Sequence, residues 1–153
     1  MIVKSPNAIP ESLEPPKIFL GGSIEMGKAE NWQELTEKRF DSEAIILNPR
    51  RDDWDSSWIQ DPTPGTQFHE QVTWELEAQK DADILVYYFA DETQSPITLL
   101  ELGLHAADIA PIVVRCTDKF WRYGNVKIVC DEHRIPVVST IEEMFEVVDF
   151  YLK

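Results

Sequence analysis

One stretch decides the fold: Asp83-Ile84-Leu85-Val86-Tyr87-Tyr88-Phe89, in which every residue after the aspartate is aliphatic or aromatic. A strand of this composition has no polar face, so we expect it at the centre of a sheet with both faces covered. Shorter apolar runs are expected to form the other strands, at residues 17–20, 44–47, 111–114 and 136–138.

The segments between these runs have apolar residues at helical spacing and are expected to be helices. They cover residues 28–41, 67–80, a segment through Leu99 to Ala107, and 140–152. Alternating strands and helices predict a parallel sheet with helices on both faces. The expected fold is therefore a single Rossmann-like or flavodoxin-like α/β domain with a five-stranded parallel sheet, over residues 17–153.

Residues 1–16 differ from the rest of the chain because they hold four of its ten prolines and no periodic pattern. We expect them to form a flexible N-terminal arm. The total of 153 residues suits one compact domain.

The chain is strongly acidic, with 28 acidic and 14 basic residues and a net charge of −14. A field of this sign repels polyanions, so we expect no binding to nucleic acid or to an anionic membrane. A small neutral or cationic ligand remains compatible with it. No stretch approaches the ~20 apolar residues of a membrane span, and the first sixteen residues lack the apolar core of a signal peptide.

The two cysteines, Cys116 and Cys130, fit neither a disulfide framework nor a zinc pattern. Cytosolic proteins keep such thiols reduced. We therefore expect a soluble, cytoplasmic protein.

In folds of this class a ligand sits beyond the carboxyl ends of the strands, where the strand order switches. The segments that follow the expected strands are therefore the candidates for a binding site. These segments are residues 21–26, 48–58, 90–97 and 116–125.

Residues 22–29 nearly match a phosphate-binding P-loop, with glycines five apart and a following lysine. The match fails at Ala29, where a P-loop carries the hydroxyl that binds magnesium. Two interpretations remain open. The glycines let the first strand pack closely on its helix, or the backbone amides and Ser23 contact a small ligand at the helix N-terminus.

Residues 50–66 form an irregular segment of a length typical of functional lids. Asp52 and Asp53 would suit a metal, but the two arginines beside them favour salt bridges instead. Trp54 and Trp58 offer either a stacking surface for a base or a means of packing the loop onto the domain.

Two glutamates give the best chemical signal. Glu101 stands among four leucines of an apolar helix, where a buried carboxylate is costly without a purpose. Glu75 lies on the preceding helix, and two carboxylates acting as nucleophile and acid/base are what glycosidic-bond chemistry needs. A solvated helix face is the competing interpretation for either glutamate. His105, four residues after Glu101, is spaced for a hydrogen bond to it along the helix.

Three blocks of sequence resemble the nucleoside 2-deoxyribosyltransferases and the related deoxynucleoside-monophosphate N-glycosidases. They occur in that family's order and spacing within residues 17–110 and cover residues 18–24, 68–71 through 82–86, and 95–103. The segments 48–54 and 120–125 look like those of a deoxyribosyltransferase-like subgroup.

The resemblance implies roles for individual residues. Glu101 falls on the family's nucleophile, which bonds covalently to C1′ of the sugar. Glu75 falls on the acid/base position, where the family usually has an aspartate. The positions expected to contact substrate are Gly21, Gly22, Ser23, Asn48, Asp53, Trp54, Asp83, Ser95 and Asn125.

The resemblance also implies an assembly and a ligand class. We expect a homo-oligomer, a dimer or higher, in which a neighbouring subunit completes the sugar pocket and contributes Asn125. The ligands are a nucleoside and a nucleobase, with no metal and no organic cofactor. Glu25 stands where the phosphate-using branch has a basic residue, which favours unphosphorylated nucleosides.

Two questions stay open at this point. Transfer to a second base and hydrolysis by water differ only in the acceptor that attacks the sugar. A noncatalytic module that senses nucleosides or nucleotides on the same fold is the alternative function, because a fold does not determine an activity. The glutamate at position 75 is the feature that most favours this alternative.

Overall fold

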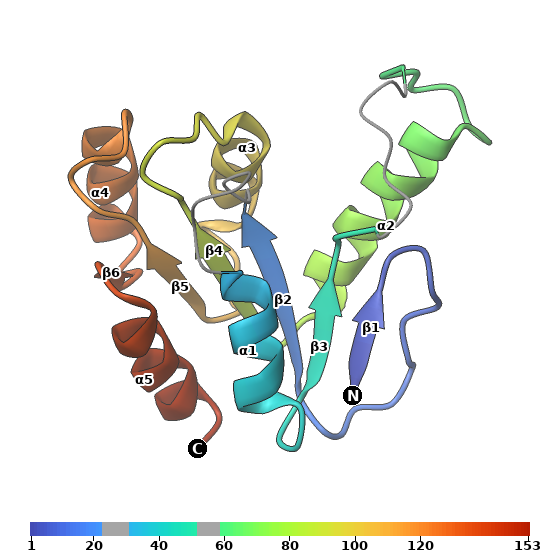
Figure 1. Cartoon of the computed structure of the whole chain (residues 1–153), viewed down its shortest axis with the longest axis horizontal. Coiled ribbons are helices and arrows are strands. Elements are labelled where there is room, and N and C mark those ends of the chain that lie inside the picture. Colours follow the sequence, from blue (N-terminus) through green and yellow to red (C-terminus); the bar gives the residue numbers. More distant parts are fainter. Residues whose placement is uncertain (23–30, 52–58) are drawn as a thin grey trace.

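A six-stranded parallel sheet forms the centre of the protein (Figure 1). The computed structural model describes residues 1–22, 31–51 and 59–153. The strand order is β1-β3-β2-β4-β5-β6. The strands are β1 (Ile2–Lys4), β2 (Lys17–Gly22), β3 (Ile45–Asn48), β4 (Ile84–Tyr88), β5 (Ile112–Arg115) and β6 (Val137–Val138).

The stretch that decided the predicted fold is strand β4, which pairs with β2 on one side and β5 on the other. Its side chains alternate between two apolar clusters. Leu85 and Tyr87 belong to one cluster, whereas Ile84 and Val86 belong to the other. The prediction of a central strand with both faces covered is therefore confirmed.

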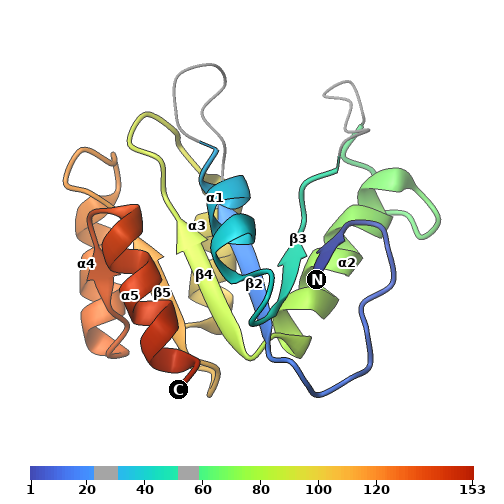
Figure 2. The same cartoon turned by 60° about the horizontal axis from the view of Figure 1, so that its bottom comes forward.

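Helices cover both faces of the sheet (Figures 1 and 2). Helices α1 (Trp32–Phe40) and α5 (Ile141–Tyr151) lie on one face, and α2 (Gln67–Asp81), α3 (Pro96–His105) and α4 (Tyr123–Glu132) lie on the other. The expected α/β fold with a parallel sheet is confirmed. No helix in the described part of the chain is long and apolar enough to cross a membrane.

The sheet has six strands rather than the expected five, because residues 2–4 of the expected arm form β1. Ile2, Val3 and Lys4 pair with residues 46–48 of β3. The amide of Ser5 extends the contact by donating to the carbonyl of Asn48 at 3.2 Å. A three-residue strand has no detectable alternation of its own, and its pairing partner lies over forty residues away.

Helix α4 was not expected either. It has a glycine and several β-branched residues in ten positions, which gives it a weak helical preference. Its N-cap, Arg122, makes no capping bond through its side chain, whereas Thr66 and Thr140 cap α2 and α5. Burial of Val126 and Cys130 against the sheet holds α4 in place, so tertiary packing outweighs the local preference.

The glycine pair at the end of β2 lets the backbone pass close to β4. A Cβ on Gly21 would lie 2.6 Å from a ring carbon of Tyr87. At Gly22, where φ is +152°, a Cβ would lie 2.4 Å from the carbonyl oxygen of Tyr88. Of the two interpretations of this segment, close packing applies to both glycines. Gly21 approaches the neighbouring strand β4, whereas Gly22 approaches both β4 and the following helix α1, where a Cβ would lie 2.9 Å from the ring of Trp32.

We predict opposite effects for two glycine substitutions. Gly21→Ala forces a methyl group against the buried ring of Tyr87, and overpacking of this kind costs about 1–3 kcal/mol of stability. Gly103→Ala adds a methyl group inside α3, where nothing lies within 4 Å, and stabilises the helix by about 0.5–1 kcal/mol. Denaturant unfolding of both variants measures the two free energies. An unchanged Gly21→Ala protein would contradict the close approach of β2 and β4.

Candidate active site

A pocket of about 490 Å³ opens between α2 and α3, beyond the carboxyl end of β2. Its volume lies in the usual range for small-molecule sites, roughly 300–1,000 Å³. Gly21 and Gly22 line it at the end of β2, and Pro49 lines it after β3. In Figure 1 the tip of β2 ends just below α3, and α2 lies to its right. The switch in strand order predicted a ligand site in this region of the fold.

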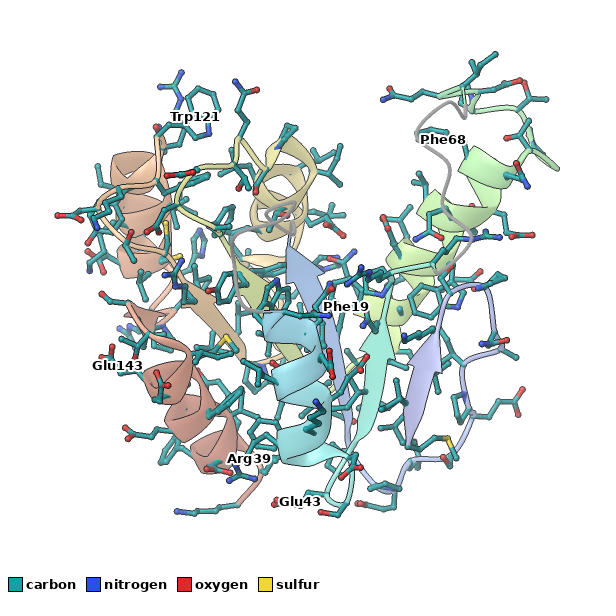
Figure 3. The ribbon with its side chains drawn as sticks, viewed as in Figure 1. Phe19, Arg39, Glu43, Phe68, Trp121 and Glu143 are labelled. Carbon is teal, nitrogen blue, oxygen red and sulfur yellow. The ribbon has the colours of Figure 1, made fainter. Side chains whose placement is uncertain are left out.

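The walls of the pocket are mainly apolar. Phe68, which lines the pocket, lies at the outer end of α2 (Figure 3). Phe19 lies in the middle of the sheet and belongs to the core instead. Side chains from both helices supply the apolar surface: Phe68, Val72, Leu76, Ile97, Leu100 and Leu104. A flat, apolar molecule the size of a nucleobase therefore fits between these walls.

Two glutamates stand opposite each other on these walls, Glu75 on α2 and Glu101 on α3. Glu101 is 9% exposed, and Glu75 is half-buried. Buried carboxylates are costly unless they are hydrogen-bonded or protonated. The competing interpretation of a solvated helix face therefore does not apply to Glu101.

Each glutamate accepts a hydrogen bond from a buried glutamine of α2. The Nε2 of Gln79 donates to Oε2 of Glu101 at 2.5 Å, and the Nε2 of Gln71 donates to Oε1 of Glu75 at 2.9 Å. Gln71, Glu75 and Gln79 are four residues apart, so they share one face of the helix.

Burial raises the pKa of Glu101 to about 8, and the nearby charge of Glu75 adds to the rise, while the bond from Gln79 opposes it. Burial also raises the pKa of Glu75, against the effect of its bond from Gln71. Two interacting carboxylates release their protons in steps that belong to the pair. At neutral pH the pair therefore holds a proton.

A pair that holds one proton provides two functions at once. One member remains an acid, while the other is a carboxylate able to attack an electrophilic carbon. Because both side chains line one pocket from different helices, a ligand held between the helices can contact both of them. This arrangement suits cleavage of a glycosidic bond.

The substrate contacts expected from the sequence fall into different places. Gly21 and Gly22 line the pocket. Asn48 does not, because its side chain is buried, donates to Glu37 at 2.7 Å and accepts from the amide of Arg50 at 2.9 Å. It shapes the turn that brings the neighbouring Pro49 to the pocket.

Ser95 and Asp83 also lie away from the pocket lining. Ser95 is buried at the N-cap of α3 with a left-handed φ of 46°, and its hydroxyl bonds to that of Thr93 at 2.7 Å. Asp83 precedes β4 and accepts a 2.8 Å bond from the amide of Lys17, which begins β2. Asp83 thus lies at the amino ends of the strands, opposite the pocket, and we leave it out of the proposed site.

The remaining expected contacts are not part of the pocket that the structure describes. Asn125 is exposed in the first turn of α4, which lies on the far side of α3 from α2 (Figures 1 and 3). Its contact with a neighbouring subunit stays a prediction. Ser23, Asp53 and Trp54 lie outside the described residues.

Five polar residues of this region were missed by sequence reasoning: Gln60, Gln71, Gln79, Tyr87 and Thr98. The four-residue spacing of Gln71, Glu75 and Gln79 was the available signal. The expected bond between His105 and Glu101 is absent. Nδ1 of His105 bonds to Asp108 at 2.7 Å, and its buried Nε2 has no hydrogen-bond partner among the described residues.

Two further expectations concern metal ligands and thiols. Within residues 1–22, 31–51 and 59–153, no group of three or more His, Cys, Asp or Glu side chains is placed to hold a metal ion. Cys116 and Cys130 are free thiols, as the sequence predicted, and both are buried.

Comparisons with known proteins agree with the resemblance. Residues 15–120, which include both glutamates, match the family model described as "Nucleoside 2-deoxyribosyltransferase like". A crystal structure of a conserved protein from Enterococcus faecalis V583 is similar to this chain, with 17% sequence identity and a TM-score of 0.62. The similarity covers 86% of this chain and 95% of that chain, and at this identity it concerns the fold alone. No curated protein matches the chain.

We predict that Glu101→Gln stabilises the protein, and more strongly as the pH rises. The pKa of Glu101 is raised from 4.5 to about 8, so folded wild type holds a proton that the unfolded chain has lost between these values. Wild-type stability therefore falls across this window, whereas glutamine does not ionise and still accepts the bond from Gln79. At about 1.4 kcal/mol per pKa unit, the difference reaches a few kcal/mol near pH 8 and vanishes near pH 4.

Unfolding in urea at several pH values measures this difference. The exposed Glu11, substituted in the same way, is the matched control. A gain in stability that does not depend on pH would contradict the burial of an ionisable carboxyl group at position 101.

Proposed function

The chain belongs to the nucleoside 2-deoxyribosyltransferase-like family, and on this premise we propose that it breaks the N-glycosidic bond of a nucleoside through a covalent intermediate on Glu101. The observation that carries the proposal is the pair formed by the buried Glu101 and the half-buried Glu75, which line one pocket from different helices. The family indicates N-deoxyribosyl transfer chemistry in general. The roles of individual residues are our proposal.

In the first step, a carboxylate oxygen of Glu101 bonds to C1′ of the sugar while the bond from C1′ to the base nitrogen breaks. The electron pair of that bond goes to the base nitrogen, which takes the proton from the carboxyl group of Glu75. The products are a free base, a glycosyl ester of Glu101 and an ionised Glu75.

In the second step, an acceptor attacks C1′ and breaks the ester bond. The electron pair returns to Glu101, and the acceptor gives a proton to Glu75, which restores the starting pair. A second base as acceptor gives a new nucleoside, whereas water gives the free sugar. The pocket's apolar walls favour a stacked base as the acceptor, so we propose transfer as the main reaction.

The ligand class follows from the charges around the pocket. Among the described residues that line it, none is Lys or Arg, and two are glutamates. A phosphate group would meet repulsion here without compensation. We therefore propose an unphosphorylated nucleoside as the substrate.

A second copy of the chain is proposed to cover the mouth of the pocket. Ile97, Leu100 and Leu104 on α3 are each more than half exposed although they line it. Exposed apolar surface next to a binding site is typical of a protein interface. A homo-oligomer, a dimer or higher, would bury these side chains and shield the sugar from water.

One observation favours the alternative function, a sensor that binds nucleosides without turnover. A pKa of about 8 leaves Glu101 largely protonated in the empty site at neutral pH. A protonated carboxyl group donates a hydrogen bond and does not attack. Catalysis by Glu101 therefore requires its proton to pass to Glu75 when the substrate binds.

We predict base exchange that depends on Glu101. The protein is incubated with deoxyadenosine or deoxyinosine, with and without cytosine, and the products are separated by chromatography. Intact mass spectrometry follows the deoxyribosyl adduct, which we expect in the wild type and not in Glu101→Gln. Base release without cytosine would identify a hydrolase instead. Binding of these nucleosides and their monophosphates without any turnover would contradict the enzymatic proposal and support the sensor.

We also predict that kcat/KM falls as the pH rises through about 8. The active form holds one proton on the pair, and deprotonation at the upper pKa, raised by burial of Glu101 to about 8, removes the acid that the leaving base needs. Glu75→Gln removes both the acid and the repelling charge, so we expect roughly 10²–10⁴-fold less activity and no alkaline limb near pH 8. If kcat/KM of Glu75→Gln still falls near pH 8, the fall must come from the titration of another group.

A further inference from the structure

We propose that Ser5 and Tyr87 are positioning residues, each of which holds a glutamine amide in the orientation that directs its NH2 group at one of the two glutamates. The catalytic consequence rests on the proposed function. The proposal stands on two similar chains of hydrogen bonds, each running from a hydroxyl through an amide to a carboxylate.

The first chain leads from the sheet to Glu101. The hydroxyl of Tyr87 on β4 donates to Oε1 of Gln79 at 2.7 Å. The Nε2 of Gln79 donates to Oε2 of Glu101, and also to the main-chain carbonyl of Glu75 at 3.1 Å. Tyr87 is fully buried and Gln79 is 2% exposed, so water does not compete for these bonds.

The second chain leads from the N-terminal segment to Glu75. The hydroxyl of Ser5 donates to Oε1 of Gln71 at 2.7 Å. The Nε2 of Gln71 donates to Oε1 of Glu75 and to the carbonyl of Pro49 at 2.7 Å. Ser5 and Gln71 are 4% and 6% exposed. The N-terminal segment is held there by a second contact, in which the indole of Trp74 donates to the carbonyl of Asn7 at 2.8 Å.

The chemistry of the partners determines how each amide is oriented. A backbone carbonyl can only accept a hydrogen bond, so the amide atom that faces the carbonyl of Pro49 or of Glu75 must be nitrogen. The second N–H of that nitrogen then points to the carboxylate. The amide oxygen on the other side needs a donor, and the hydroxyls of Ser5 and Tyr87 are the donors that it receives.

Loss of either hydroxyl would leave a buried amide oxygen without a donor. The amide would then gain by rotating toward other partners, and its bond to the carboxylate would weaken. A bond donated to a carboxylate favours the charged form. Tyr87 therefore promotes ionisation of Glu101 through Gln79, and Ser5 acts on Glu75 in the same way through Gln71.

The two series of hydrogen bonds also distinguish the two oxygens of each carboxylate, because only one of them accepts from an amide. Oε2 of Glu101 and Oε1 of Glu75 are occupied by the amides. We therefore assign attack on C1′ to Oε1 of Glu101 and the proton for the leaving base to Oε2 of Glu75.

The test compares Tyr87→Phe and Ser5→Ala with a matched control, Tyr151→Phe. The hydroxyl of Tyr151 also donates a hydrogen bond, to the carbonyl of Ile112 at 3.0 Å, but it lies on α5, on the other face of the sheet. The pKa values of the glutamate carboxyl groups are measured by ¹³C NMR titration of the whole protein. This readout does not require turnover.

We expect Tyr87→Phe to raise the pKa of Glu101, Ser5→Ala to raise the pKa of Glu75, and Tyr151→Phe to change neither. Ser5→Thr keeps the hydroxyl and should restore the wild-type titration. If Tyr87→Phe does not fold, Gln79→Met removes the amide at similar volume and should raise the pKa of Glu101 in the same direction. Unchanged titration of both glutamates in folded variants would overturn the proposal, whether or not the wild type turns over nucleosides.

Activity gives a second, independent readout. Tyr87→Phe should lower kcat about tenfold or more with little change in KM, because the bond that Gln79 donates to the ionised nucleophile is weakened. Ser5→Ala should slow the turnover of deoxyadenosine. It should not slow the turnover of 7-methyl-2′-deoxyguanosine, because the cationic base of that nucleoside leaves without needing a proton. Equal losses on both substrates would contradict the role of Ser5. Absence of wild-type turnover would instead count against the proposed function alone.

Discussion

Burial of the Glu101 carboxyl group is the constraint on which the rest of the site depends. A carboxyl group on an apolar helix, 9% exposed, is stable only if the surrounding atoms satisfy it or keep it protonated. The protein does both. Helix α2 supplies the amide of Gln79, the central strand supplies the hydroxyl of Tyr87, and the low polarity of the pocket raises the pKa. The same burial bears on the proposed reaction, because a poorly solvated carboxylate would be a strong nucleophile once its proton has passed to Glu75.

The sheet determines where this group can stand. The close passage of β2 against β4 requires glycine at positions 21 and 22, and these glycines form the floor between the two helices. Helices α2 and α3 both belong to the connections that lead into and out of β4. The central strand therefore controls the spacing of the walls that carry Glu75 and Glu101, in addition to contributing Tyr87.

Much of this arrangement was predictable from the sequence, for identifiable reasons. Strand β4 stands out in the sequence as an unbroken apolar run. Glu101 stands out as a charged residue within the apolar segment that forms α3. Gln71 and Gln79 give a weaker signal, their four-residue spacing from Glu75, which does not identify a buried face because neutral amides occur on exposed and buried faces alike. Asp83 was expected at the site from the resemblance alone, although its place just before β4 puts it at the amino end of the strand, away from the pocket. Strand β1 depends on a partner far along the chain and leaves no local pattern.

The three-residue strand β1 links the site to the edge of the sheet. It pairs with β3 alone, and short edge elements with few partners open at a lower free energy than the core. Its release would withdraw Ser5 from Gln71 and uncover the row of backbone groups along β3. Hydrogen exchange at β1 would then report on the integrity of the Glu75 wall. Heat would open this contact below the temperature at which the core melts, and the uncovered β3 edge would then offer a place at which two such chains can pair.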